Sequence, residues 1–157
     1  MVELEVGMKA PVFSLPDALG KKVSLKDFFG KWVVVYFYPK DDTPGCTIEA
    51  LDFTKFSKEF LKLKIKVLGI SKDNCVSHQK FIDKHKLNLE LLSDVDHKLQ
   101  ESFGVWRKKK FMGREYLGTV RSTFLIDKKG KIVNIWDDIS AKGHANEVLE
   151  YIKTNCK

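Results

Sequence analysis

Cys46 stands where a cysteine can act as a nucleophile. It follows the apolar run WVVVYFY, typical of a buried strand, after a short polar segment that ends in TPG. Thr43 is a good helix N-cap and Pro44 suits the first helical position, so Cys46 falls in the first turn of a predicted helix. Free backbone N–H groups and the helix dipole favour an anion there. The position predicts a thiolate nucleophile, and the alternative is a small, buried apolar residue.

Two strands and a helix would place this cysteine at one edge of a sheet. The run Trp32–Tyr38 is apolar throughout, which is typical of a strand covered on both faces, and Ile65–Ile70 predicts a second strand. Between them, apolar residues with helical spacing form one face: Phe53, Phe56, Phe60 and Leu63. Such a unit has parallel strands, and ligands bind beyond their carboxyl ends, where Pro39–Cys46 lies.

The rest of the chain completes an α/β pattern. The other predicted elements are a hairpin of Val12–Leu15 and Val23–Leu25, a helical turn at Leu25–Phe29, a helix from Asp73 to about His85, a strand at Leu89–Leu92, a helical stripe of Val95, Leu99 and Phe103, a hairpin of STFLID and KIVNIW, and a closing helix with Ala145, Val148, Leu149 and Ile152. This order predicts one domain over residues 1–157, with a mixed central sheet and helices on both faces.

Composition restricts the class of protein. The chain has 157 residues, of which 43% are hydrophobic. No apolar run approaches the ~18–20 residues of a membrane-spanning helix, and the N-terminal segment resembles no leader peptide. We therefore expect a soluble, cytoplasmic protein without a membrane partner. Three cysteines with irregular spacing do not suggest a secreted disulfide scaffold, so reduced thiols fit better.

The net charge of +7 raises the question of an anionic partner. The densest basic run, Arg107–Lys110, could attract phosphate groups, which keeps a non-enzymatic nucleic-acid-binding module open as an alternative. We expect a solvated loop there instead, because no RNP-type or zinc-finger pattern accompanies the run. The histidines are expected on solvated helix faces, with no metal site: His78, His85, His97 and His144.

A family resemblance carries the interpretation further. Pro39, Thr43 and Cys46 match the peroxiredoxin pattern P-x-x-x-T-x-x-C. The strings YFYPKDDTPGCTIEA, GISKD, SHQKF, LLSDVDHKL, FGVW and RSTFLIDKKGKIV resemble the bacterioferritin comigratory protein, or PrxQ, branch over nearly the whole chain. The resemblance implies a thioredoxin-like fold with an N-terminal β-hairpin extension. It also implies a cofactor-free thiol peroxidase that reduces hydrogen peroxide and organic hydroperoxides in antioxidant defence.

The same resemblance assigns roles to individual residues. Cys46 would be the peroxidatic cysteine, which is oxidised to a sulfenic acid. Arg121, at the start of RSTFLID, would stabilise the thiolate and the breaking O–O bond. Thr43 would hydrogen-bond the thiolate or the peroxide, and Pro39 would shield the site from water, although Pro39 could also simply end the strand. Glu49 would either cap the helix start, the preferred role, or orient the arginine.

The chain departs from its family in the cysteine that resolves the sulfenic acid. Relatives carry it five residues after the peroxidatic cysteine, where this chain has Leu51, or on the next helix, near Ile82 to His85. Three alternatives remain. Cys75, the nearest sulfur by topology, could resolve within the chain after the Cys46 helix turn unwinds. An outside thiol could serve in a one-cysteine mechanism, or Cys156 could resolve within or between chains.

A second redox class is a disulfide oxidoreductase. That activity would need a Cys-x-x-Cys motif at the helix start, whereas the segment from Pro44 to Thr47 offers one sulfur. The thiol peroxidase is therefore the first interpretation, with thioredoxin or a similar thiol as reductant. We expect a monomer or a weak homodimer.

Overall fold

A five-stranded mixed sheet organises the chain. The computed structural model describes residues 4–156. The strand order is β5-β4-β3-β8-β9, with bounds β3 Trp32–Phe37, β4 Ile65–Ser71, β5 Glu90–Ser93, β8 Ser122–Ile126 and β9 Ile132–Trp136. Strands β3, β4 and β5 are parallel, and β8 and β9 each run antiparallel to their neighbour. The predicted parallel unit and the predicted β8–β9 hairpin are confirmed.

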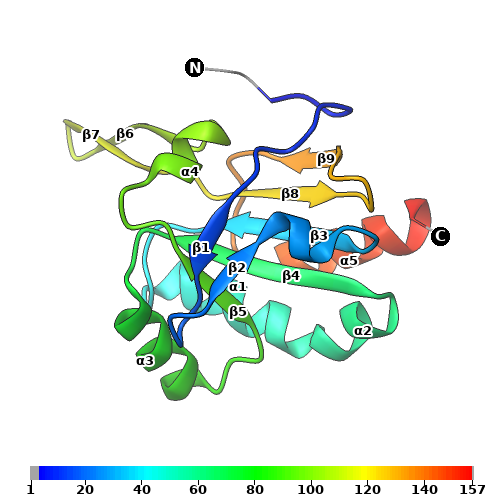
Figure 1. The fold of residues 1–157 in the computed structure, drawn as a ribbon. Coiled ribbons are helices and arrows are strands. Elements are labelled where there is room, and N and C mark those ends of the chain that lie inside the picture. The colour runs from blue at the N-terminus through cyan, green and yellow to red at the C-terminus, as the bar shows by residue number, and fades with distance from the viewer. Residues whose placement is uncertain (1–3, 157) are drawn as a thin grey trace.

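Helices cover both faces of this sheet (Figure 1). One face carries α1 (Pro44–Lys55), α2 (Ser57–Lys62), α3 (Cys75–His85) and α5 (His144–Asn155), and the other carries α4 (Lys98–Ser102). The two crossovers from β3 to β4 and from β4 to β5 step in the same direction, so their helices lie on the same face. Strand β3 is apolar throughout because it faces a core on each side, as predicted.

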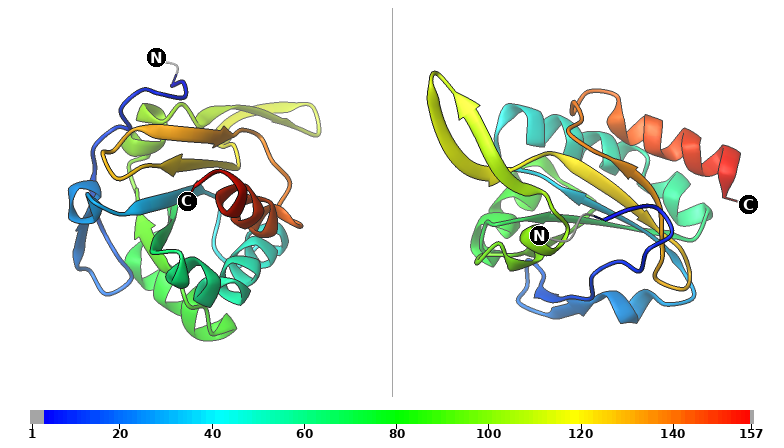
Figure 2. Two further views of the ribbon diagram at one scale, coloured as in Figure 1. Left: turned by 90° about the vertical axis from the view of Figure 1, so that its right-hand side faces the viewer. Right: turned by 90° about the horizontal axis from the view of Figure 1, so that it is seen from above.

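The N-terminal segment covers the face opposite α1. Strands β1 (Ser14–Pro16) and β2 (Lys22–Ser24) pair antiparallel, and a 3-10 turn, Leu25–Phe28, follows. Phe13 and Leu25 from this segment are buried in the core beneath β3. Figure 2 shows, in its left view, this blue segment on one side of the sheet and α1 and α5 on the other. The predicted hairpin extension and helical turn are confirmed.

Two predicted helices differ from the observed ones. The helix that follows Cys46 is interrupted at Phe56, which ends α1 and precedes α2 with non-helical backbone angles (φ −96°, ψ 9°). Despite the break, Phe53 and Phe60 are buried in the same core and Phe56 packs against it, so the predicted apolar face is confirmed for these three residues. Leu63 comes after α2 and is 37% exposed, so its place on that face was wrong. Val95 is exposed and lies before α4 rather than in it.

The basic run is part of a strand, not of the solvated loop that we predicted. Strands β6 (Trp106–Phe111) and β7 (Arg114–Thr119) form a separate hairpin that projects from the body of the molecule (Figure 1). Met112 and Gly113 at its turn have positive φ angles of 50° and 79°, as a two-residue hairpin loop requires. A long two-stranded ribbon keeps its side chains solvated, which is why a run of lysines suits it.

The helices are short and amphipathic. Within residues 4–156, none is long and apolar enough to cross a membrane.

Candidate active site

Cys46 lies in the first turn of α1, beyond the carboxyl end of β3. Its side chain is buried, with 2% of its surface exposed, and it packs in the core on the face of the sheet that α1 and α5 cover. Thr43 occupies the N-cap position in extended backbone, as predicted, but its hydroxyl makes no capping bond to the helix. The Thr43 hydroxyl instead donates to the carbonyl oxygen of Lys40 at 2.8 Å. This hydrogen bond therefore joins the two ends of the short loop from Lys40 to Thr43.

Arg121 contacts Cys46 from the segment just before β8, the strand that pairs with β3. It directly precedes β8, and the antiparallel pairing of Ser122 with Phe37 brings it to the end of β3 from which the Cys46 loop departs. Arg121 Nη2 donates to Cys46 Sγ at 3.4 Å, and Arg121 Nη1 lies 2.6 Å from Glu49 Oε1. The structure thus brings together three of the residues singled out from sequence, although they are up to 75 positions apart in the chain.

Gly45 leaves the space through which the guanidinium approaches the sulfur. A Cβ atom at position 45 would lie 3.0 Å from Arg121 Nη2. A contact that close would force the arginine to shift, so glycine permits the Arg121–Cys46 hydrogen bond. Sequence reasoning used the TPG segment as a helix start and missed this second role.

Glu49 pairs with Arg121 instead of capping the helix. It lies in the interior of α1, is fully buried, and one of its oxygens binds the guanidinium. The cap that we preferred from sequence is therefore wrong. Burial raises the pKa of Glu49 from an ordinary 4.5 to about 7, although the nearby charge of Arg121 opposes the rise. Near neutral pH, Glu49 is therefore present in both its charged and its neutral form.

The raised pKa of Glu49 makes stability depend on pH. The native state keeps a proton on Glu49 that the unfolded state loses, so its contribution is complete below pH 4.5 and is lost as the pH rises toward about 7. We expect the free energy of unfolding of the wild type to fall across this window, relative to Glu49→Gln, by at most about 3 kcal/mol. Urea denaturation of both proteins at a series of pH values measures the difference. Parallel pH profiles would contradict the assigned pKa.

Tyr36 is a further residue of the site that sequence reasoning counted only as apolar. Its ring stacks on Phe53 at 4.6 Å, and its buried hydroxyl has no hydrogen-bond partner within the described part of the chain. Burial, and then the negative charges of Glu49 and Cys46, raise its pKa, so the phenol keeps its proton. No pattern in an unbroken apolar strand distinguishes such a tyrosine from a core residue.

Pro39 comes two residues after Phe37, the last residue of β3, and is partly buried. The backbone N–H of Tyr38 donates to Ile70, after which the proline has no N–H to continue the ladder. The predicted strand end is confirmed, while shielding of the sulfur stays a prediction.

The other two cysteines are not brought to Cys46. Cys75 begins α3, and Ser93 at the end of β5 donates to its sulfur at 3.9 Å. Ser93 belongs to β5, which is separated from β3 by β4, so the nearest printed partner of the Cys75 sulfur lies away from the strand that leads to Cys46. Cys156 lies beside Trp32, at the other end of β3. All three thiols are free.

Comparisons with known proteins agree with this arrangement. The model of the AhpC/TSA family matches residues 6–135. The chain is 47% identical to peroxiredoxin Bcp of Bacillus subtilis over 150 residues, which is 96% of each chain. A structure of the Xanthomonas campestris bacterioferritin comigratory protein, in a study of its alkyl peroxide reduction activity, has 40% identity and a TM-score of 0.88 over 92% of each chain. A PrxQ mutant of Xylella fastidiosa has 33% identity and a TM-score of 0.94 over the whole of both chains.

Proposed function

Since the chain belongs to the AhpC/TSA family of peroxiredoxins, in its bacterioferritin comigratory protein (PrxQ) branch, it is a thiol peroxidase, and we propose that Cys46 is its peroxidatic sulfur. The enzyme has a thioredoxin-like fold and reduces a hydroperoxide with electrons from a thiol. The observation that carries the assignment of Cys46 is its hydrogen bond from Arg121 at the start of a helix.

The proposed reaction begins with the Cys46 thiolate. The sulfur attacks one peroxide oxygen, an S–O bond forms, and the O–O bond breaks with its electron pair on the leaving oxygen, which takes a proton to become water or an alcohol. Sulfur is oxidised to a sulfenic acid and the peroxide is reduced. The Arg121 guanidinium lies beside the sulfur, where it stabilises the thiolate and the charge that develops on the peroxide.

Thr43 and Pro39 are proposed to shape the peroxide site. The Thr43 hydroxyl gives its only proton to Lys40, so its lone pairs are available to accept a hydrogen bond from a peroxide O–H. Pro39 offers no N–H to water at the end of β3. Both hydrogen peroxide and organic hydroperoxides are proposed substrates, in keeping with the alkyl peroxide reduction named for the Xanthomonas campestris relative.

An outside thiol is proposed to reduce the sulfenic acid, with a thioredoxin as the protein reductant. Cys75 lies on the β5 side of the sheet and Cys156 at its other end, which supports a one-cysteine cycle over an internal disulfide. We further propose that the chain forms one domain, acts as a monomer or a weak homodimer, and works in a reducing compartment such as the cytoplasm. The three free thiols suit such a compartment.

The double variant Cys75→Ser/Cys156→Ser tests this cycle. We expect it to keep peroxide turnover with thioredoxin, thioredoxin reductase and NADPH within about twofold of the wild type, because neither sulfur takes part and surface substitutions change little. NADPH consumption measures turnover. Each single variant is the control, and a loss of activity that follows one of them would identify that cysteine as the resolver and overturn the one-cysteine cycle.

A further inference from the structure

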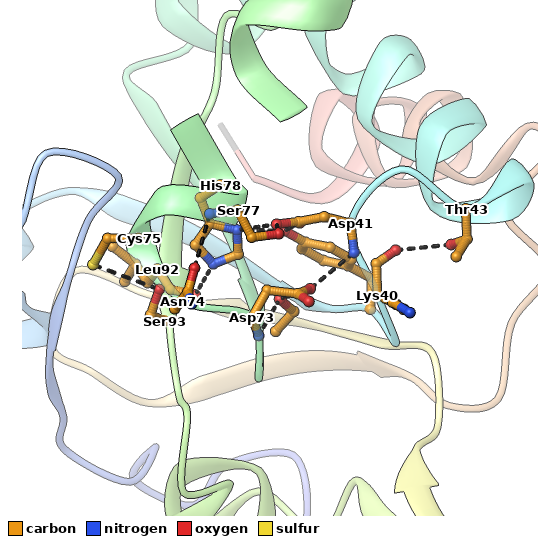
Figure 3. Close-up of polar contacts among 12 residues, drawn as sticks. Lys40, Asp41, Thr43, Asp73, Asn74, Cys75, Ser77, His78, Leu92 and Ser93 are labelled. Atoms are coloured by element: carbon orange, nitrogen blue, oxygen red, sulfur yellow. Dashed lines mark hydrogen bonds and ion pairs between the residues drawn. The ribbon is translucent and has the colours of Figure 1, made fainter. Parts of the chain in front are cut away.

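Three buried polar side chains, Tyr38, Asp41 and His78, and the partly buried Ser77 meet between α3 and the loop that carries Thr43. Tyr38 donates to Asp41 Oδ1 at 2.6 Å, Ser77 donates to Asp41 Oδ2 at 2.8 Å, and His78 Nδ1 lies 2.8 Å from the same Oδ2. The His78 side chain is fully buried and that of Asp41 is 4% exposed. Figure 3 shows Asp41 facing His78 and Ser77 across this contact. We predicted His78 and His144 on solvated helix faces, and both predictions were wrong, since His144 is 2% exposed.

Each polar atom at the centre of the network has a partner. His78 Nε2 donates to the carbonyl oxygen of Leu92 on β5 at 3.0 Å, since a carbonyl can only accept. Its other nitrogen, Nδ1, lies 2.8 Å from Asp41 Oδ2, so both ring nitrogens have a polar partner. Burial, and then the charge of Asp41, raise the pKa of Tyr38, so that hydroxyl keeps the proton that it donates. A buried network that is fully satisfied holds its members in one arrangement.

The main chain of Asp41 is also held, by hydrogen bonds at the end of β4. The N–H of Asp41 donates to Asp73 Oδ2 at 2.8 Å, and Ser71 donates to that same oxygen at 2.7 Å. Strand β4 and the start of α3 therefore fix the position of residue 41 through both its main chain and its side chain.

We propose that the Asp41–His78 contact is a latch that holds the Thr43 loop closed, and that this contact positions Thr43 and Cys46 for the peroxide reaction. The inference deepens the proposed function and rests on it. Asp41 lies between Lys40, which accepts the Thr43 hydrogen bond, and the start of α1, so the latch sets where Thr43 and the first helical turn stand. Cys46 is 2% exposed, which leaves its sulfur out of reach of a protein thiol while the loop stays closed.

The latch therefore affects two rates in opposite directions. A closed loop keeps Cys46 beside Arg121 and favours reaction with a small peroxide. An open loop exposes the sulfur to a larger reagent but removes the arrangement on which the peroxide reaction depends. A side chain that only contributes to global stability would not produce this opposite pair of effects.

The same helix and loop supply a matched control. Asp42, next to Asp41, pairs with Lys84 at 2.7 Å and with His85 at 2.8 Å, but Asp42 is 40% exposed. Water can replace these contacts, so their loss should matter little. His85→Gln changes the same residue type in the same helix, against the same loop, without touching the buried network.

The test compares wild type, His78→Gln and His85→Gln as reduced full-length proteins. The rate of reaction with hydrogen peroxide is measured by stopped-flow fluorescence. The rate of alkylation by iodoacetamide is measured at each cysteine by peptide mass spectrometry, with Cys75 and Cys156 as internal references. For His78→Gln we expect the peroxide rate to fall about tenfold and alkylation of Cys46 alone to rise by a similar factor, because a buried charge-assisted hydrogen bond is lost. His85→Gln should match the wild type in both rates.

Three results would refute the proposed role of the Asp41–His78 contact. These are unchanged rates in His78→Gln, a slower peroxide reaction without faster alkylation of Cys46, and faster alkylation at all three cysteines, which signals global loosening. If His78→Gln does not fold, Asp41→Asn, which keeps the side-chain shape but removes the charge, is judged by the same criteria. If Cys46 of the wild type does not react with peroxide, the proposed function is refuted instead. The alkylation rates would still show whether the Asp41–His78 contact keeps Cys46 inaccessible.

Discussion

Cys46→Ser is expected to lower peroxide turnover at least about a thousandfold, because a serine hydroxyl at this position is neither ionised near neutral pH nor readily oxidised. The residue is small and buried, and serine fills nearly the same volume, so the variant should fold. Hydrogen peroxide consumption with thioredoxin as reductant measures the effect. Cys75→Ser is the matched control, since Cys75 also begins a helix at the carboxyl end of a parallel strand.

Turnover of Cys46→Ser close to that of the wild type would refute the assignment of the peroxidatic sulfur. If Cys75→Ser lost activity by the same factor while Cys46→Ser kept it, the reactive thiol would lie on the β5 side of the sheet and the family role would have been carried to the wrong cysteine.

Arg121→Lys is expected to slow the reaction of the reduced enzyme with hydrogen peroxide by about a hundredfold. Lysine keeps the positive charge but has one donor group, whereas Arg121 bonds Cys46 and Glu49 at once through two nitrogens of a rigid fork. A smaller fraction of thiolate at neutral pH should accompany the loss. Stopped-flow kinetics measure the rate, and ultraviolet absorbance measures the thiolate.

Arg107→Lys is the control for this substitution. Arg107 also forms a paired contact with a carboxylate, Asp137, but it lies on the β6–β7 hairpin and is partly exposed. The change should leave the peroxide rate within about twofold of the wild type, as for most surface substitutions. Equal rates in wild type and Arg121→Lys would show that the guanidinium does not act on the sulfur, despite its position.

The elements around Cys46 could be predicted because local sequence signals agree there. An unbroken apolar run indicates a strand with two covered faces, and Thr-Pro-Gly indicates a helix start, so the position of the cysteine follows from neighbours within a few residues. The family pattern added Arg121, which no local signal distinguishes from a surface strand residue. Its contact with Cys46, which is 75 positions away in the chain, depends on the pairing of β3 with β8.

The errors arose where a partner distant in the sequence decides the environment. His78 looks like any helix-surface histidine until α3 packs on the loop that holds Asp41. Glu49 looks like a cap until Arg121 arrives from β8. The basic run, expected in a solvated loop, lies in a two-stranded ribbon, where lysine side chains can stay in water although lysine is a poor strand former.

The most direct test of the account is the fate of each sulfur after one equivalent of hydrogen peroxide. The reduced protein is oxidised, its remaining free thiols are blocked, and it is digested without reductant for peptide mass spectrometry. A one-cysteine cycle at Cys46 predicts one added oxygen atom on Cys46, trapped by a reagent specific for sulfenic acid, with Cys75 and Cys156 both alkylated and the intact protein a single chain. A disulfide that joins Cys46 to Cys75 or Cys156, or an oxidised sulfur elsewhere with Cys46 alkylated, would contradict it.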